Sequence, residues 1–178
     1  MRNIVRLAAL AATVAAASPA FAQSVPPPIS ADATADAKGV VLQPLTLTKE
    51  DDLDFGTVIS TAVAGSVTIN ADDGSREVGG GVLEVPSYPG GRGLFTGNAS
   101  KDRVVELTLD APSHLVSTTD PLDVIVVTKM VLDDDNNLSR TVGESGIFQV
   151  GVGGEFAIEA NQPNGFYRAQ FKLTADYQ

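Results

Sequence analysis

Residues 165–178 at the C-terminus have the sequence GFYRAQFKLTADYQ. From Tyr167 to Tyr177, aromatic or aliphatic residues hold every odd position and polar residues hold every even position. Successive side chains of a β-strand point to opposite faces of a sheet, so this alternation predicts one long terminal strand with an apolar and a polar face. A terminal strand either pairs within a sheet or leaves an edge that can accept another strand.

The chain before this stretch also predicts short strands separated by turns. An Asp72-Asp73-Gly74 sequence is typical of a tight hairpin turn, and an aspartate-rich segment at 133–137 predicts another turn. Residues 86–97 and 111–120 are expected to be loops. Strands are expected at 40–48, 53–59, 65–71, 77–85, 104–109, 122–132, 138–142, 147–152 and 155–159. Many short strands with frequent turn signals predict an all-β antiparallel sandwich.

The first 22 residues predict a secretory signal peptide. Arg2 and Arg6 precede an Ala-rich apolar run, and Ala20-Phe21-Ala22 follows Pro19 as a small-x-small cleavage site. The alternative is an uncleaved anchor, although the apolar run is short for a membrane span. We therefore expect an exported protein, located in the periplasm, on the cell surface or outside the cell, with no membrane span after cleavage.

Composition limits the partners that the mature chain can have. The sequence contains no cysteine, so disulfides and a lipoprotein anchor are excluded. Its formal net charge is −10, and removal of Arg2 and Arg6 with the signal peptide makes it −12. Nucleic acids and anionic membrane surfaces attract basic proteins, so neither is an expected partner. The length predicts a single domain, residues 40–178.

Residues 23–39 predict a flexible N-terminal arm. Pro26, Pro27 and Pro28 favour an extended conformation without ladder hydrogen bonds. After them, small apolar residues alternate with polar residues up to Val41. The arm is either a solvated leader or an extended strand that pairs with another strand. In the second case its donor positions are Ala35, Ala37, Gly39 and Val41.

Side chains that could carry catalysis or bind a cofactor are scarce. His114 is the only histidine, and its neighbour Ser113 is too close in sequence for a catalytic triad. One histidine without cysteine does not make a zinc site, and the glycine-rich stretch 89–93 lacks the Lys-Ser/Thr of a phosphate loop. The acidic segments 50–54 and 133–137 offer oxygen ligands for calcium, but they also suit solvated turns. No cofactor is predicted.

The C-terminal stretch resembles that of pilins assembled by the chaperone–usher route. Those subunits carry a glycine fourteen residues from the end, a penultimate tyrosine and alternating apolar residues between them. The matching positions here are Gly165, Tyr167, Ala169, Phe171, Leu173, Ala175 and Tyr177. Residues 40–178 also resemble a bacterial family of secreted domains of unknown function, which begins with a motif like Leu53-Asp54-Phe55-Gly56. The chain lacks the cysteine pair of many pilins.

The resemblance to pilins implies an incomplete immunoglobulin-like sandwich that is completed by a strand from another molecule. We therefore expect a non-enzymatic structural or adhesive protein, a subunit of fimbriae or a surface matrix that assembles by β-strand addition. Its partners would be other copies of itself or a periplasmic chaperone. The alternative is a self-complete sandwich that binds a polysaccharide or surface partner through loops 86–97 and 111–120. A hydrolase with paired carboxylates is a third hypothesis.

Overall fold

The computed structural model describes residues 30–178, and the chain divides into two units between Gly39 and Val40. In the first unit, residues 30–39 are exposed and have no regular secondary structure. The predicted signal peptide, residues 1–22, and the proline run at 26–28 lie outside the described residues. The second unit, from Val40 to Gln178, contains every strand found among residues 30–178.

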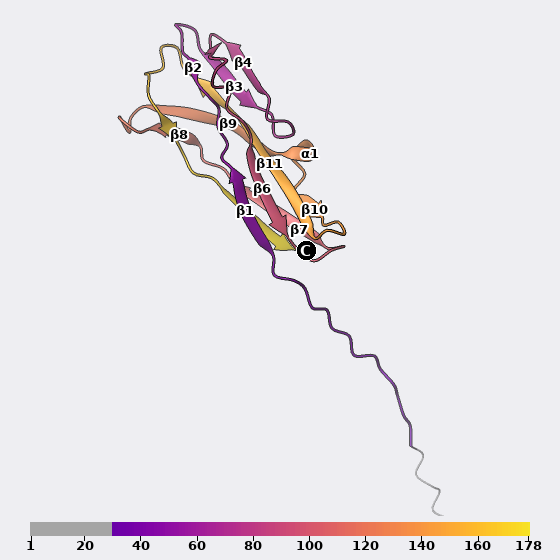
Figure 1. Ribbon diagram of the computed structural model, residues 1–178. Helices are drawn as coiled ribbons and strands as arrows, with labels where there is room; N and C mark the ends of the chain where they lie inside the picture. The colour runs from indigo at the N-terminus through magenta and orange to yellow at the C-terminus, as the bar shows by residue number, and fades with distance from the viewer. Residues whose placement is uncertain (1–29) are drawn as a thin grey trace, which may run out of the picture. The chain divides into compact units, whose positions relative to one another are not determined.

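This second unit consists mainly of one large antiparallel sheet and one small one (Figure 1). The large sheet has, in spatial order, β1 (Thr46–Asp51), β6 (Gly93–Asn98), β11 (Ile147–Ile158), β9 (Val124–Leu132), β8 (His114–Ser117) and β12 (Tyr167–Arg168). β3 (Gly65–Ile69) pairs with the second half of β11, and β4 (Arg76–Gly80) pairs with β3. The small sheet has the order β10 (Ser139–Thr141), β7 (Val104–Asp110), β13 (Lys172–Tyr177).

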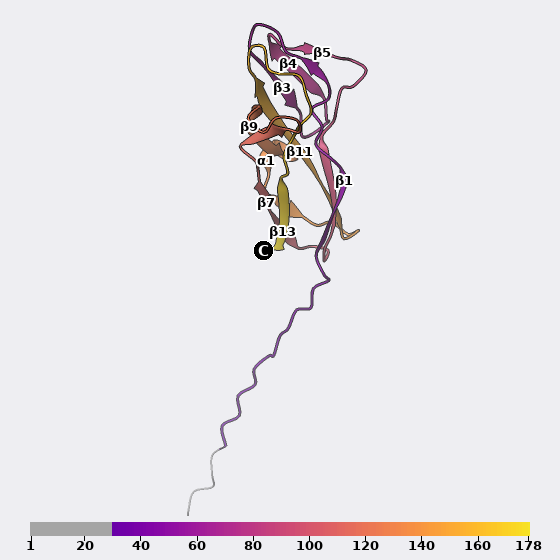
Figure 2. The same ribbon diagram turned by 90° about the vertical axis from the view of Figure 1, so that its left-hand side faces the viewer.

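The small sheet covers part of one face of the large sheet, so the prediction of an all-β sandwich is confirmed (Figure 2). A separate two-stranded ribbon, β2 (Val58–Ile59) with β5 (Leu83–Glu84), lies at the end of the unit opposite the C-terminus (Figures 1 and 2).

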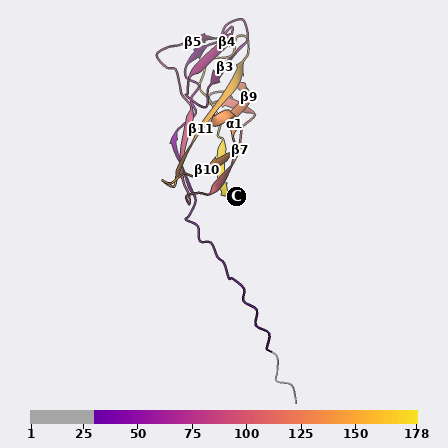
Figure 3. The ribbon, with the colours of Figure 1, turned by 90° about the vertical axis from the view of Figure 1, so that its right-hand side faces the viewer.

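The longest strand, β11, is the centre of the large sheet. Its first half pairs with β6, its second half pairs with β3, and β9 pairs with residues 152–157 on the other side. Figure 3 shows β11 with β3 and β9 near it. The strands on its two sides bury most of β11. Their backbones can approach that of β11 closely because β11 contains glycines. A β-carbon at Gly153 would lie 2.4 Å from the carbonyl oxygen of Ile69, and one at Gly151 would lie 2.3 Å from that of Ala71.

Two clusters of buried side chains form the core. The first core cluster lies between the two sheets and contains Ala99, Val105, Leu107, Leu132, Val142, Phe148, Val150 and Val152. The second core cluster lies around the β3 half of β11 and contains Val67, Val82, Ile125, Phe156 and Ile158. Phe55 packs edge-to-face on Phe156, with ring centroids 4.4 Å apart. Both clusters contain side chains of β11, so this strand joins the two halves of the core.

Several of the predicted segments differ from the structure. The expected strand 40–48 is a strand only from Thr46, 53–59 contains only β2, and 77–85 contains residues of two strands, β4 and β5, which belong to different sheets. The expected strands at 147–152 and 155–159 are one continuous strand, β11, because Gly153 and Gly154 pair with β9 instead of interrupting the ladder. The expected loop 86–97 contains β6, which lies between β1 and β11. The expected loop 111–120 contains β8. Glycines and polar residues marked these segments as loops, but pairing with neighbouring strands outweighs that local signal.

The predicted single strand at 165–178 is also wrong, because the chain changes sheets within it. β12 pairs with β8 in the large sheet, whereas β13 pairs with β7 in the small sheet. Residues 169–171 lie between the two strands and carry the chain from one layer to the other. A strand that changes sheets keeps its alternation of apolar and polar residues, so the sequence pattern does not reveal the break.

Three arginines hold the turns in place by donating hydrogen bonds to backbone carbonyls. Arg76 is almost fully buried, and its Nη1 donates to the carbonyl oxygens of Tyr88 (2.9 Å) and Thr57 (3.2 Å). Arg92 donates to the carbonyl of Ala71 (2.9 Å), and Arg140 donates to carbonyls of the turn after β9. The Arg76 bonds add to backbone hydrogen bonds, since the Tyr88 and Thr57 carbonyls also accept the N–H groups of Thr57 (3.0 Å) and Val85 (3.2 Å).

The turn after β9 contains α1 (Asp133–Asn136), which is not an ordinary helical turn. Asp134, Asp135 and Asn136 have φ values of 52°, 57° and 59°. Aspartate and asparagine tolerate this left-handed conformation better than other side chains do. Arg140 binds the Asp133 carboxylate, so the turn predicted for this aspartate-rich segment is held by an ion pair at its base.

Candidate functional site at the β1–β13 seam

β1 and β13 are two of the edge strands of the sandwich, and each has one partner among the described residues. β1 pairs only with β6, and β13 pairs only with β7. We call the place where these two edges face each other the β1–β13 seam. It consists of the inward-facing side chains of Leu45, Leu47, Phe171, Leu173, Ala175 and Tyr177.

The side chains of the seam are apolar but only half-buried. Leu45, Leu47, Leu173 and Ala175 pack against the first core cluster, yet each keeps part of its surface exposed. Leu107, in the middle of the same cluster, is 1% exposed. Burying apolar surface is favourable in proportion to its area, so a strand that covered the seam would gain free energy from these side chains.

The peptide groups of the seam residues also lack ladder partners. The Gln178 N–H donates to the Val104 carbonyl (3.0 Å), so Gln178 and Val104 form a hydrogen-bonded pair. In an antiparallel ladder every second residue bonds to the same neighbour. The N–H and C=O groups of Leu173, Ala175 and Tyr177 therefore point away from β7, toward the open edge. These are the same residues whose side chains face the core.

The same register argument applies to β1. The Ala99 N–H donates to the Gly146 carbonyl (2.9 Å), so the odd positions of β6 bond to β11 and its even positions bond to β1. Thr46 and Thr48 are the β1 residues opposite those even positions. The peptide groups of Leu45 and Leu47 thus face the seam, and both edges present free donors and acceptors beside half-buried apolar side chains.

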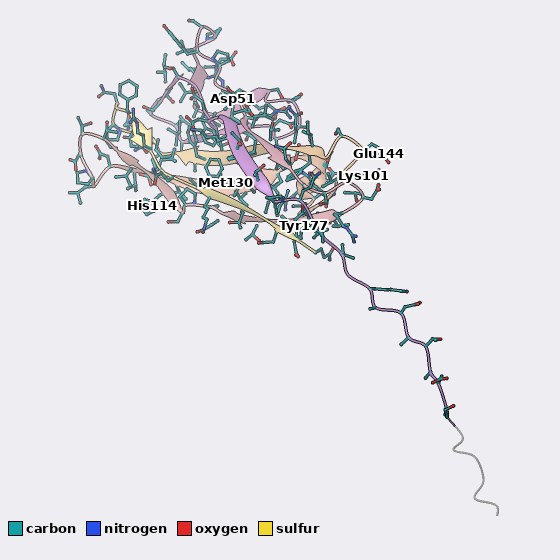
Figure 4. All side chains as sticks on the ribbon, turned by 60° about the horizontal axis from the view of Figure 1, so that its bottom comes forward. Asp51, Lys101, His114, Met130, Glu144 and Tyr177 are labelled. Carbon is teal, nitrogen blue, oxygen red and sulfur yellow. The ribbon has the colours of Figure 1, made fainter. Side chains whose placement is uncertain are left out.

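Side chains close the seam at its two ends. The Tyr177 hydroxyl accepts a hydrogen bond from the Ser100 N–H (2.7 Å) and donates one to the Gln43 carbonyl (2.8 Å). At the other end, Phe171 makes an edge-to-face contact with Phe95, with centroids 5.9 Å apart. Figure 4 shows Tyr177 at the same end of the unit as Lys101 and Glu144, with His114 at the other end.

The structure brings some of the predicted assembly-strand residues together and separates the others. Phe171, Leu173, Ala175 and Tyr177 lie along the seam. Tyr167 belongs to β12 in the other sheet, and its hydroxyl donates to the Pro163 carbonyl (2.7 Å). Gly165 lies in an exposed bend before β12, and Ala169 is exposed in the crossing between β12 and β13. The change of sheet after β12 explains why these earlier positions are away from the seam.

The β1 half of the seam was not among the predicted site residues. Leu45 and Leu47 alternate with polar residues in the expected first strand, so a signal was present in the sequence. Alternation shows which face of a strand is apolar but not which edge is free, so it did not identify these residues as part of a site.

The predicted donor positions do not pair with any described strand. Ala35, Ala37 and Gly39 are exposed and lie outside regular secondary structure. In the second unit, Val41 is 98% exposed, and its neighbours Val40 and Leu42 are exposed as well. Three consecutive exposed aliphatic residues therefore precede Gln43, which the Tyr177 hydroxyl holds.

The other candidate residues stand apart from the seam. His114 is exposed, and its Nδ1 lies 2.8 Å from Ser113 Oγ. Within residues 30–178, no group of three or more metal-ligating side chains converges. Asp72 and Asp134 belong to two acidic turns that lie together, since the Asp134 N–H donates to Asp72 Oδ1 (2.8 Å). Beside these turns the outer face of the large sheet has a hollow of about 400 Å³.

One carboxylate near these turns has a clearly shifted pKa. The side-chain and backbone hydrogen bonds of Ser75 lower the pKa of Asp73 below 3.8, because they stabilise the charged form. Asp73 Oδ1 accepts the Ser75 N–H at 2.8 Å, which closes the turn between β3 and β4. The shift therefore reflects the structure of a turn.

Residues 45–177 match the model of a domain family described as domain of unknown function DUF4402. The chain belongs to this family. The matched region begins at Leu45 beside β1 and ends at Tyr177 in β13, so the DUF4402 domain contains both edges of the seam. No curated protein and no solved structure matches the chain. Among residues 30–178, no helix is long and apolar enough to cross a membrane.

Proposed function

We propose that this DUF4402 protein is an exported, non-enzymatic bacterial subunit that builds surface fibres or a matrix by β-strand addition. The observation that supports the proposal is the seam between β1 and β13. Two strand edges there present free peptide groups beside half-buried apolar side chains. In β-strand addition, ladder hydrogen bonds supply affinity and the pockets for alternate side chains supply specificity.

The topology supports the same function. The order β1-β6-β11-β9 facing β10-β7-β13 is that expected of an immunoglobulin-like sandwich that lacks a strand beside its last one. This arrangement agrees with the pilin-like C-terminal stretch, in which the penultimate residue is Tyr177. In this proposal the strand that fills the seam comes from another copy of the chain or, before assembly, from a periplasmic chaperone.

The arm before β1 is the donor in this proposal. Its alternation leads through Ala35, Ala37 and Gly39 to Val41, so one face of an extended arm would be apolar. Alanine and glycine bury little surface, and therefore ladder bonds to the free peptide groups would supply most of the affinity. The exposed Val41 would be the largest side chain that the arm inserts.

Size-exclusion chromatography of the purified protein, with and without residues 23–39, tests this function. The intact protein is expected to form oligomers, and the shortened protein is expected to be a monomer. Ala175→Lys, which places a charge in the seam, should also prevent assembly. Asp176→Lys on the same strand is the matched control, because Asp176 is exposed on the other face. Intact protein that stays monomeric at all concentrations would refute the proposal.

A second candidate function is polysaccharide binding by a self-complete domain, which the hollow of about 400 Å³ favours. Its lining residues include Asn70, Ser75, Glu77, Lys129, Asn136 and Glu155, whose polar groups can hydrogen-bond sugar hydroxyls. Neither 86–97 nor 111–120 lines it. Glycan-array binding that is lost in Glu155→Ala, by a protein that remains monomeric, would support this function over strand addition.

A further inference from the structure

The hydroxyl of Tyr177 connects three parts of the chain that are distant in sequence. It accepts the Ser100 N–H (2.7 Å) from the loop after β6 and donates to the Gln43 carbonyl (2.8 Å) just before β1. The Gln43 N–H in turn donates to Ser100 Oγ (2.7 Å). Both backbone polar groups of Gln43 are therefore satisfied by the two side chains, and no ladder holds this residue.

These bonds are the direct polar link between the two edges of the seam within residues 30–178. β1 and β13 belong to different sheets and form no ladder with each other. Two residues before Gln43, Val41 is 98% exposed, whereas Leu42 between them is 38% exposed. The Tyr177 contact thus marks the point at which the chain changes from an exposed arm to a fixed part of the sandwich.

We propose that Tyr177 is a latch that holds Gln43 against β13 and closes this end of the seam to an added strand. A strand that pairs with Leu173 and Ala175 would meet the Gln43 segment when it reaches the free peptide groups of Tyr177. Full occupation of the edge therefore requires the Tyr177–Gln43 bond to open. Tyr177 acts as a positioning residue, since it controls where the Gln43 segment lies. This inference rests on the proposed strand addition.

The Tyr177–Gln43 hydrogen bond is weak enough to break reversibly, and it is strong enough to lower the affinity for an added strand. A hydrogen bond of this kind shifts an equilibrium about fivefold, and loss of the hydroxyl also leaves the Ser100 N–H unsatisfied in the closed state. When the binding-competent state is a minor population, apparent affinity falls by the fraction that is competent. Removal of the hydroxyl should therefore raise the apparent affinity for an added strand about tenfold.

The test uses the full protein as Tyr177→Phe, with Tyr167→Phe as the matched control. Tyr167→Phe also removes a hydroxyl that donates to a loop carbonyl, that of Pro163, but it does so in the other sheet. The probe is a fluorescent synthetic peptide with the sequence of residues 31–41, and fluorescence anisotropy measures its binding. Unfolding curves in urea confirm that each variant is folded.

The expected result is binding about tenfold tighter to Tyr177→Phe than to the unchanged protein and to Tyr167→Phe. Equal affinity of the peptide for the unchanged protein and both variants would refute the proposed latch, but it would not contradict strand addition. Weaker binding by Tyr177→Phe would also overturn it, since the hydroxyl would then assist the added strand. Absence of binding to every protein, together with an intact protein that is monomeric, would count against both the latch and strand addition.

Discussion

β11 and β13 both contribute to the packing of the first core cluster, but they differ in the number of strands beside them. β11 has β9 on one side and β6 followed by β3 on the other, and it is buried along most of its length. β13 has β7 alone, and its inward-facing side chains are only half-buried. The difference shows that burial in this sandwich depends on neighbours at the strand edges as well as on apolar side chains.

β11 is rich in large apolar side chains such as Phe148 and Phe156, and it also contains glycines, which β13 lacks. β13 has regular alternation with Leu173 and Tyr177, whereas β11 contains Gly151, Gly153 and Gly154. The glycines allow neighbouring backbones to approach β11 closely, so their lack of side chains helps to build the centre of the sheet. Large side chains on β13 face a seam that the described chain leaves partly uncovered.

The largest expected effect tests the close packing around β11. In Gly153→Ala the new β-carbon would lie 2.4 Å from the Ile69 carbonyl oxygen and 2.5 Å from the Ala71 nitrogen, so the backbone of β3 must shift. We expect the free energy of unfolding in urea to fall by about 3 kcal/mol. Gly143→Ala is the control, since no atom lies within 4 Å of its β-carbon position. Equal losses in the two variants would show that backbone approach does not explain the glycines of β11.

A prediction of intermediate size compares the cost of replacing leucine by alanine in the core interior and in the seam. Leu107→Ala removes a side chain that is 1% exposed, and we expect the free energy of unfolding to fall by about 3 kcal/mol. Leu173→Ala removes a half-buried side chain, and we expect a loss of about 1 kcal/mol in the monomer.

Comparison of the monomer with the oligomer makes this second prediction more specific. If an added strand covers the seam, the cost of Leu173→Ala should increase in the oligomer while the cost of Leu107→Ala should not. Urea unfolding of both variants at low and high protein concentration measures this difference. A cost of Leu173→Ala that is the same in both states would place the added strand elsewhere.

The smallest effect concerns the turn that supplies β11 with its neighbour β3. The pKa of Asp73 is lowered in the folded state, so this carboxylate stabilises the fold above its unfolded pKa, and the contribution is lost as pH falls through the lower folded pKa. NMR titration should give a lower midpoint for Asp73 in the folded protein than in urea. Ser75→Ala should move the folded midpoint upward. Identical midpoints in folded and unfolded protein would contradict the assigned hydrogen bonds.

The sequence was sufficient to predict the fold class because alternation and turn residues report which faces are apolar. Of the residues predicted as an assembly strand, Phe171, Leu173, Ala175 and Tyr177 lie along the seam, whereas Gly165, Tyr167 and Ala169 do not. The sequence could not reveal that the chain changes sheets after Arg168, since alternation continues through the crossing. It also missed β6, because Gly93 and Gly97 resemble loop residues until their packing is known.

Gly97 illustrates why such positions require the three-dimensional structure. Its missing side chain leaves room for the ring of Phe148 from the neighbouring strand, and a β-carbon there would lie 2.1 Å from that ring. No short stretch of sequence reveals that a glycine packs against an aromatic residue so much later in the chain. The seam is similar, because Leu47 and Leu173 pack against the same core cluster from two different sheets.

The carbonyl-binding arginines have a consequence for contacts between copies. Arg76, Arg92 and Arg140 direct their guanidinium groups to their own backbone, so they are not available to pair with acidic groups on a neighbouring molecule. The chain has 22 acidic residues against 12 basic ones, which makes mutual repulsion between copies strong at low ionic strength. Added salt screens such repulsion. The ionic strength of the surroundings would then set how readily the subunits associate.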